Sequence, residues 1–319
     1  MRYRTPTYNR RSFLAHATGI GAAVAAGSLL PLEEAQAASG PMLTRPIPSS
    51  GERIPVIGMG SWVTFNVGED IAVRTARADV LKTFFVQGGG MVDSSPMYGS
   101  AQDVIGWSLR HLQAQGMSTD SLFSATKVWT PVFEKGPGQM AQARRLWGLN
   151  RFDLMQVHNL VDWEEHLQTL AADKEAGRVR YVGITTSHGR RHGDFAAIME
   201  NHPLDFVQFT YNILDREAEA RLLPLAAERG IGVIINRPFR RRGLINQFAG
   251  KPLPEWAGEI GATSWPQFLL KFVVSHPAVT CAIPATSQIP HMVENMGVGR
   301  GPMPDAGMRA RMVRHVEAL

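Results

Sequence analysis

The chain has 319 residues, of which 44% are hydrophobic and 19% are charged, a balance typical of a globular enzyme with a sizeable core. The formal net charge of +5 is not arranged as one long basic stripe, which argues against a nucleic-acid-binding protein. The single cysteine, Cys281, excludes an internal disulfide and lies in an apolar run, so we expect it in the core.

The first residues carry the features of an export signal. Asn9-Arg10-Arg11-Ser12-Phe13-Leu14 resembles the twin-arginine motif, and residues 13–30 then contain no Asp, Glu, Lys or Arg. Ala35-Gln36-Ala37 supplies a small-residue pattern that predicts cleavage after Ala37. The alternative is an uncleaved membrane anchor, but several glycines make the uncharged stretch only weakly apolar.

We therefore divide the chain into a twin-arginine (Tat) signal peptide, residues 1–37, and one mature domain, residues 38–319. Proteins with such signals generally fold before they cross the membrane. The predicted location is the periplasm or the outside of the cell, reached through the Tat export machinery, with no stable membrane insertion after cleavage.

From residue 54 onward, short β-rich runs alternate with longer stretches of helical spacing. The predicted strands are Val56–Trp62, Gly90–Ser94, Leu122–Val128, Phe152–His158, Tyr181–Thr186, Phe206–Tyr211, Ile231–Asn236 and Thr280–Pro284. The predicted helices cover 71–87, 101–113, 138–148, 162–176, 191–200, 217–229, 263–275 and 290–296, with a last helix near 305–318 and a long loop over 250–261.

Local signals support several of these boundaries. Asp162, with Glu165 three residues later, predicts a capping box at the start of a helix. Gly177 and Gly230 stand where helix ends favour a left-handed residue. Eight strand–helix units fit an α/β fold of the (β/α)8 TIM barrel type, and no G-x-G-x-x-G motif follows the first strand to suggest a Rossmann fold.

Polar residues cluster where the second, third and fourth predicted strands end, and the carboxyl ends of barrel strands face one common site. They are Asp93, Tyr98, Lys127 and His158. This set suits the reduction of a carbonyl group, in which negative charge grows on oxygen and a proton must be supplied. Tyr98 is the candidate acid, and Lys127 would stabilise the phenolate. Asp93 would anchor the lysine, and a neutral His158 would orient the carbonyl.

The spacing Asp93-x-x-x-x-Tyr98-Gly99, followed by Lys127 and His158, resembles the catalytic tetrad of the aldo/keto reductase family. Agreement extends along nearly all of residues 41–297. It includes Ile57–Trp62, the helix glycine Gly106, Asp153–His158, Gly177–Gly183, Val207–Asn212 and the segment Ile283–Asn295.

The resemblance implies NADP(H) as cofactor, with NAD(H) as the alternative, bound in extended form across the barrel mouth. Thr185, Thr186 and Gln208 match positions that hold the nicotinamide carboxamide, although Thr186 replaces a common Asn. Thr286, His291 and Asn295 belong to the segment expected to contact the adenosine half, with Asn295 near the adenine.

Two departures from the family pattern stand out. Asn236 and Arg237, followed by Pro238, occupy the region where many relatives stack an aromatic ring on the nicotinamide. Ala285 and His291 stand where many NADPH-preferring relatives have Lys and Arg. The triplet that begins at Arg240 is a candidate for gripping the pyrophosphate, with a solvated loop as the alternative.

A small carbonyl compound is the expected substrate. Trp62, Met97 and Trp129 lie beside the tetrad or follow barrel strands, and we expect them to line the substrate pocket, with simple packing as the alternative. The remaining histidines have no metal-ligand spacing, so no metal is expected. The rival functions are a nicotinamide-binding redox sensor or subunit with little turnover, and a hydrolase, for which a second carboxylate or a metal cluster is missing.

Overall fold

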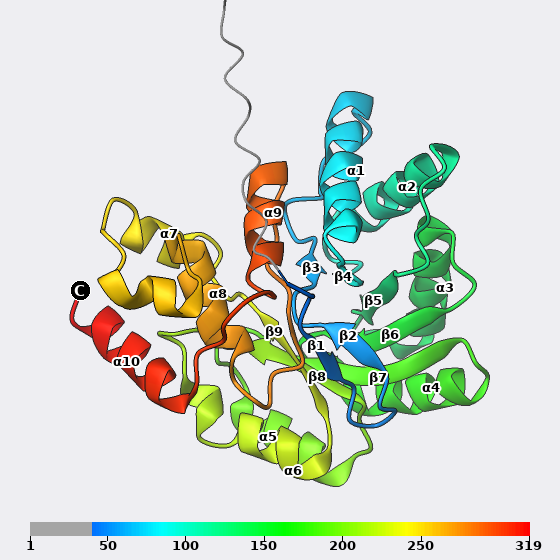
Figure 1. Cartoon of the computed structure of the whole chain (residues 1–319). Helices are drawn as coiled ribbons and strands as arrows, with labels where there is room; N and C mark the ends of the chain where they lie inside the picture. Colours follow the sequence, from blue (N-terminus) through cyan, green and yellow to red (C-terminus); the bar gives the residue numbers. More distant parts are fainter. Residues whose placement is uncertain (1–39) are drawn as a thin grey trace, which may run out of the picture. The chain divides into compact units, whose positions relative to one another are not determined.

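The computed structural model describes residues 40–319, and the predicted signal peptide with its twin-arginine motif and cleavage pattern lies outside them. An eight-stranded parallel sheet occupies the centre, in the order β10-β9-β8-β7-β6-β5-β4-β3, so each strand pairs with its neighbour in sequence (Figure 1). The strands are β3 (Met59–Gly60), β4 (Met91–Asp93), β5 (Phe123–Val128), β6 (Phe152–Val157), β7 (Val179–Thr185), β8 (Phe206–Thr210), β9 (Gly232–Asn236) and β10 (Cys281–Ala282).

Backbone hydrogen bonds between the first and last strands close this sheet into a barrel. The Gly58 N–H donates to the Ala282 carbonyl at 2.8 Å, and the Ala282 N–H donates to the Val56 carbonyl at 2.9 Å. A Cβ on Gly60 would lie 2.8 Å from the Ile283 carbonyl oxygen, so glycine permits this close approach. The (β/α)8 barrel predicted from the sequence is confirmed, although its first strand is shorter than expected.

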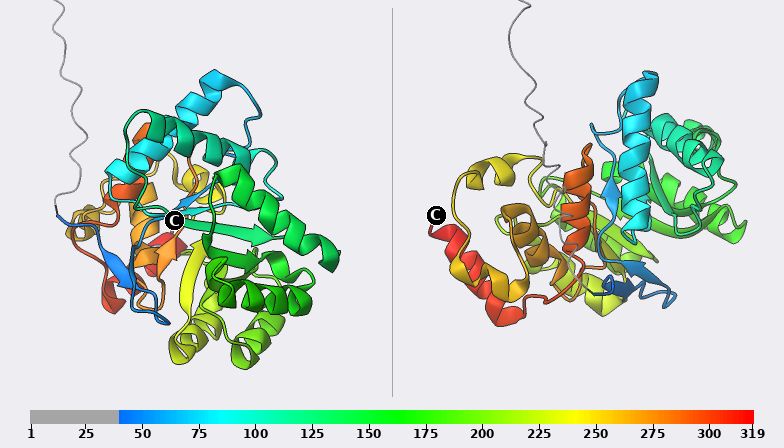
Figure 2. Two further views of the ribbon diagram at one scale, coloured as in Figure 1. Left: turned by 90° about the vertical axis from the view of Figure 1, so that its right-hand side faces the viewer. Right: turned by 45° about the horizontal axis from the view of Figure 1, so that its top comes forward.

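Helices surround the strands, and α1 packs against α9 where the ring closes (Figure 1). The helices are α1 (Ile71–Val86), α2 (Ala101–Ala114), α3 (Gly136–Trp147), α4 (Trp163–Glu175), α5 (His192–Asn201), α6 (Leu222–Arg229), α7 (Gly243–Phe248), α8 (Trp265–Val274), α9 (Ile289–Gly297) and α10 (Ala306–Glu317). The last helix, α10, drawn in red, lies near α8 (Figure 2). The two helices are joined by the stacking of His315 on Trp265. Among the described residues, no helix combines the length and apolarity that a membrane span requires.

Several local expectations are corrected. Asp162 does not form a capping box, because its backbone is left-handed (φ 49°) and its carbonyl, not its carboxylate, accepts the His166 N–H. The helix α7 was not predicted, and the expected loop over 250–261 contains a short 3-10 helix, Glu255–Ile260. The two helix-ending glycines are confirmed, with φ of 69° at Gly177 and 63° at Gly230.

An N-terminal hairpin, also not predicted, seals the end of the barrel where the strands begin. It consists of β1 (Thr44–Pro46) and β2 (Arg53–Pro55), paired antiparallel. Ile47 and Ile54 join a buried cluster with Phe123, Phe206 and other residues from the first halves of the barrel strands. Because this end is plugged, a ligand reaches the barrel from the opposite end, where the strands finish.

The contact between α2 and the end of α3 depends on a glycine. A Cβ on Gly106 would lie 1.8 Å from the Leu146 carbonyl oxygen. Relieving this clash requires the backbone of α3 to shift, which is costlier than moving a side chain. We expect Gly106→Ala to lower the free energy of unfolding by about 1–3 kcal/mol or more, measured by urea denaturation. Gly138→Ala is the matched control. An added Cβ there meets nothing within 4 Å, so α3 should gain stability. Equal effects of the two substitutions would contradict this account of the contact.

Lys271, on α8, is an almost fully buried cation that holds the chain after α9. Its ammonium group donates to the carbonyls of Val298 (3.3 Å), Arg300 (2.9 Å) and Pro302 (2.9 Å). It forms no ion pair among the described residues. Burial lowers the pKa of Lys271 to about 8.

This shift predicts how stability changes with pH. Above the folded pKa of Lys271, the unfolded chain holds a proton that the folded chain has lost, so the free energy of unfolding should rise from pH 8 toward pH 10. Denaturation curves at several pH values should show this rise in the wild type and a smaller one in Lys271→Met. Parallel pH profiles for the two proteins would show that Lys271 does not cause the effect.

Candidate active site

The four tetrad residues predicted from the sequence meet at the open end of the barrel. Asp93 ends β4 and forms a buried ion pair with Lys127 of β5, whose side chain is essentially inaccessible. Lys127 also donates to the Ser94 carbonyl at 2.8 Å. The second oxygen of Asp93 accepts hydrogen bonds from the amides of Gln156 (3.1 Å) and Gln208 (3.0 Å). The ion pair joins β4 to β5, and amides from β6 and β8 satisfy the remaining oxygen of Asp93.

Tyr98 and His158 lie beside this ion pair. Their rings meet edge to face, with centroids 5.8 Å apart, and the Lys127 ammonium is 5.3 Å from the centroid of the Tyr98 ring. The His158 Nδ1 lies 2.7 Å from the Ser95 hydroxyl. The phenol and the imidazole can thus face one carbonyl oxygen together.

The surroundings set the charge of each group. Burial, with a contribution from the Asp93 carboxylate, raises the pKa of Tyr98 far above 10, so the phenol keeps its proton. Burial lowers the pKa of Lys127, while Asp93 opposes this shift. Burial and the Lys127 charge hold the pKa of His158 well below 6.5, which favours a neutral imidazole.

The predicted nicotinamide-side residues form a hydrogen-bonded chain across β7, β8 and β9. The Asn236 amide donates to the Thr186 carbonyl at 2.9 Å, and the Asn236 oxygen accepts from the Thr210 hydroxyl at 2.7 Å. The Thr185 hydroxyl accepts the Asn159 N–H at 3.1 Å. Gln208 is almost fully buried, and its amide nitrogen donates a hydrogen bond to Asp93. Gln208 is therefore in direct contact with the tetrad.

Cationic side chains gather beyond the end of β9. Burial and the nearby charges of Arg241 and Arg190 lower the pKa of Arg237, while the Asp215 carboxylate acts in the opposite direction. Arg240 is instead paired with Asp215, with its Nε 2.8 Å from the carboxylate. Pro238, which lies between the two arginines in the sequence, is buried. The group fits an anionic ligand such as a pyrophosphate, because guanidinium groups match phosphate geometry.

The predicted adenosine-side residues lie at the start of α9. The Thr286 hydroxyl accepts the Gln288 N–H at 3.1 Å and shapes the turn that precedes the helix. His291 is exposed in the first turn, and Asn295 is buried one turn later. Ala285 is also exposed, so no Lys or Arg occupies either of the two positions noted above.

Apolar side chains rim the open end on the side of β3, β4 and β5. The exposed fractions are 38% for Trp62, 38% for Met97 and 39% for Trp129, values unusual for side chains of this size. The Arg241 guanidinium stacks on the Trp62 ring at 4.3 Å and links this rim to the cationic group. Val132 and Phe133, which sequence reasoning did not select, extend the rim and are equally exposed.

Two polar residues of the site were also not selected from the sequence. Gln156 lies inside a buried strand, where a polar side chain is unusual and needs a partner. Ser95 lies between Asp93 and Tyr98 within the quoted motif, but nothing in the sequence pairs it with His158. Across residues 40–319 no group of three or more His, Cys, Asp or Glu side chains is placed to hold a metal ion.

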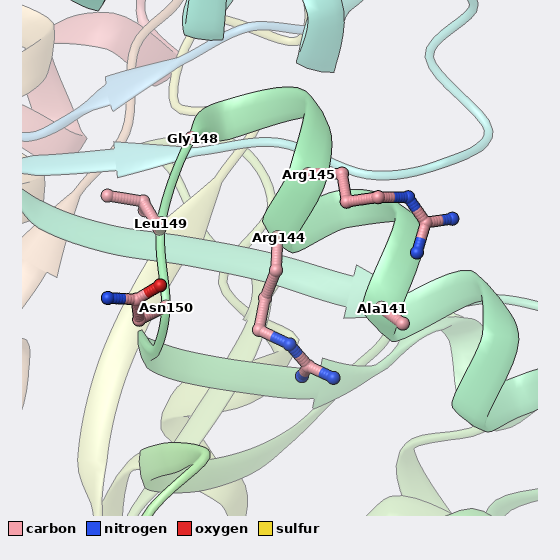
Figure 3. A pocket seen from close by; sticks show the side chains of 6 residues that line it. All are labelled: Ala141, Arg144, Arg145, Gly148, Leu149 and Asn150. Carbon is pink, nitrogen blue, oxygen red and sulfur yellow. The ribbon is translucent and has the colours of Figure 1, made fainter.

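A shallow surface hollow lies far from this chemistry, at the end of the barrel where the strands begin. Arg144 and Arg145 of the last turn of α3 line it together with the turn Gly148–Asn150 and Ala141 (Figure 3). Arginines at a helix C-terminus compensate the partial negative charge of the free carbonyls, which explains their presence there. The hollow contains no acid, base or nucleophile arranged for catalysis.

Comparisons with known proteins agree with the geometry. Probable aldo-keto reductase 1 of Glycine max is 23% identical over 65% of this chain and 61% of its own length. Aldo-keto reductase YhdN of Bacillus subtilis is 25% identical over 59% of this chain and 60% of its own length. The matched segments thus span about three fifths of each of these relatives.

Solved structures with the same fold include an aldo/keto reductase from Klebsiella pneumoniae in complex with NADP and acetate. It has a TM-score of 0.69 and 21% identity, over 83% of this chain and 92% of that one. The holo form of aldo-keto reductase AKR11C1 from Bacillus halodurans has a TM-score of 0.70 and 20% identity, over 86% and 96% of the two chains. A model of the aldo/keto reductase family matches residues 56–310, most of the barrel, and the chain therefore belongs to the aldo/keto reductase family.

Proposed function

We propose that the protein catalyses the reversible, NAD(P)H-dependent reduction of an aldehyde or ketone to an alcohol, with Tyr98 as the general acid. The observation that carries the proposal is the buried Asp93–Lys127 pair directly beside a protonated phenol and a neutral imidazole. Family membership and relatives named as aldo-keto reductases support it.

A bound reduced nicotinamide supplies the hydride. As negative charge grows on the carbonyl oxygen, the Tyr98 hydroxyl donates its proton to that oxygen, and the alcohol forms. The phenolate left behind is stabilised by the Lys127 ammonium, which Asp93 holds in place. Neutral His158 donates an N–H to the same oxygen and orients the carbonyl.

The proposed cofactor contacts follow the open end of the barrel. Thr185, Thr186, Gln208 and Asn236 would surround the nicotinamide, and the arginines after β9 would hold the pyrophosphate. Thr286, His291 and Asn295 would contact the adenosine half. Solved relatives contain NADP, which favours NADP(H), whereas Ala285 and His291 provide no Lys or Arg for a 2′-phosphate and leave NAD(H) as the competitor.

The exposed rim indicates the kind of carbonyl compound. Trp62, Met97 and Trp129 present apolar surface at the open end of the barrel, and covering such surface with an apolar group is favourable. We expect aldehydes or ketones with an aromatic or branched apolar group to have lower KM values than short polar ones.

Titration of the purified protein with NADPH and with NADH, followed by nicotinamide fluorescence, tests the proposal. A panel of aldehydes is then added and cofactor oxidation is recorded. Binding with oxidation supports the reductase and identifies the preferred cofactor. Tight binding without oxidation of any aldehyde would favour the alternative, a nicotinamide-binding redox sensor or subunit. Failure to bind either nucleotide would overturn the assignment.

We further propose that residues 1–37 direct export of the folded protein through the Tat machinery to the periplasm or beyond, with cofactor carried along in the bound state. The support is the Asn9–Leu14 motif and the cleavage pattern at Ala35–Ala37. Cell fractionation should find the wild type outside the cytoplasm, and Arg10→Lys/Arg11→Lys should remain inside. Equal distribution of the two proteins would rule out a twin-arginine signal.

A further inference from the structure

The hydrogen bond between Ser95 and His158 is buried and well defined. The Ser95 hydroxyl oxygen lies 2.7 Å from the His158 Nδ1, and the two residues are 0% and 6% exposed. The same hydroxyl oxygen accepts the Met97 N–H at 3.3 Å. Water therefore does not compete for this contact, and the backbone holds the serine in place.

Counting hydrogens decides the direction of this bond. The serine hydroxyl carries one hydrogen, and Met97 can only donate to it. Within residues 40–319 the His158 Nδ1 is the one acceptor in reach of that hydrogen. If Nδ1 carried a proton instead, the serine hydrogen would be buried without a partner, which is unfavourable. The serine therefore donates to Nδ1, and the ring proton resides on Nε2.

The Nε2 atom is the nitrogen that catalysis requires. It forms no hydrogen bond with another described residue, whereas Nδ1 is engaged by the serine. The edge-to-face contact with the Tyr98 ring keeps the imidazole next to the phenol. An N–H on Nε2 can donate to a carbonyl oxygen bound beside Tyr98, but a bare Nε2 lone pair would repel that oxygen.

We propose that Ser95 is a positioning residue that fixes His158 in the Nε2–H tautomer and so presents a hydrogen-bond donor to the substrate carbonyl. This inference rests on the proposed reductase function. The chain contains a second Ser–His contact, between Ser187 and the His188 Nδ1 at 2.8 Å, but it is exposed. Water competes there for both partners, so no tautomer is enforced.

Replacement of the serine should expose this role. In Ser95→Ala, His158 can adopt both tautomers, and only one of them donates to the substrate. We expect kcat for aldehyde reduction to fall by about tenfold or more, with cofactor affinity unchanged, because the lost interaction acts on the growing oxyanion. Ser95→Thr keeps the hydroxyl and should recover most of kcat.

Ser108→Ala is the matched control. Ser108 is also fully buried, but its hydroxyl donates only to the Val104 carbonyl (2.7 Å) within its own helix. The substitution removes the same atom from the core and leaves the site intact. We expect its kcat to equal that of the wild type.

Nitrogen-15 NMR of histidine-labelled protein tests the inference without relying on turnover. The His158 resonances are identified by their absence in His158→Gln, and their shifts and couplings distinguish the two tautomers. We expect the Nε2–H form in the wild type and a mixture in Ser95→Ala. An Nδ1–H form in the wild type, or an unchanged Nε2–H spectrum and kcat in Ser95→Ala, would overturn the proposal.

The two readouts also separate the failure modes. If the wild type oxidises no cofactor but shows the Nε2–H form, the reductase assignment fails and the tautomer assignment stands. If turnover is normal and the tautomer is Nδ1–H, the role of Ser95 fails alone. Should Ser95→Ala not fold, the wild-type spectrum and the kcat of Ser95→Thr still decide the matter.

Discussion

Tyr98→Phe is expected to lower kcat for aldehyde reduction by about 10²–10⁴-fold, the usual contribution of a well-placed general acid. The substitution removes only the phenolic oxygen, and that oxygen forms no hydrogen bond to another described residue. The fold and the affinity for NAD(P)H should therefore stay close to those of the wild type. Steady-state kinetics and fluorescence titration of the cofactor measure the two quantities.

Tyr181→Phe provides the comparison. Tyr181 lies near the plugged end of the barrel, where its hydroxyl donates to Glu52 at 2.7 Å, far from the tetrad along the strand. Its loss should reduce stability slightly and leave kcat unchanged. If Tyr98→Phe retained full kcat, the proton would have to come from another group and the proposed role of Tyr98 would be wrong.

Lys127→Met should lower both the stability and the activity of the protein. It leaves the Asp93 carboxylate buried with only the Gln156 and Gln208 amides as partners, and breaking one side of a buried ion pair costs about 3–5 kcal/mol. The variant also removes the charge that stabilises the phenolate. We expect both the free energy of unfolding and kcat to fall, measured by urea denaturation and by steady-state kinetics.

An exposed ion pair gives the scale for this effect. The Arg216 Nη2 and the Glu317 Oε1 lie 2.7 Å apart on the surface. Arg216→Met should therefore lower the free energy of unfolding by no more than about 1 kcal/mol. The double variant Asp93→Asn/Lys127→Met removes both charges and keeps an oxygen for the two amides. It should recover part of the stability but none of the activity. If the single variant Lys127→Met were as stable as the wild type, leaving the Asp93 carboxylate without its partner would cost little, and this account of the ion pair would be wrong.

The sequence predicted the barrel well because strands of this fold are buried on both faces and separated by amphipathic helices. The hairpin of β1 and β2 was missed since its strands are three residues long and contain Pro46 and Pro55, which disfavour a strand prediction. Asp162 was misassigned because a capping box depends on backbone conformation, and its left-handed φ is not encoded in the residue types around it.

For the site, the spacing of Asp93, Tyr98, Lys127 and His158 along the sequence was enough to select these four residues. The carboxyl ends of barrel strands converge regardless of the conformation of the loops that follow them. What could not be predicted were contacts between residues far apart in sequence. Ser95 with His158 and Arg241 with Trp62 are of this kind. The pairing of Arg240 with Asp215 likewise limits its availability to a phosphate, which the run of three arginines alone does not indicate.

Closure of the barrel through Gly58, Gly60 and the residues around Ala282 also bears on how the protein is made. Gly58 and Ala282 are separated by more than two thirds of the chain, so the barrel cannot close until nearly all of the chain has been synthesised. Until then, the edges of β3 and β9 present unpaired backbone groups that other chains can bind. A nascent chain of this protein therefore depends on prompt completion, or on a chaperone that shields those two edges, to avoid aggregation.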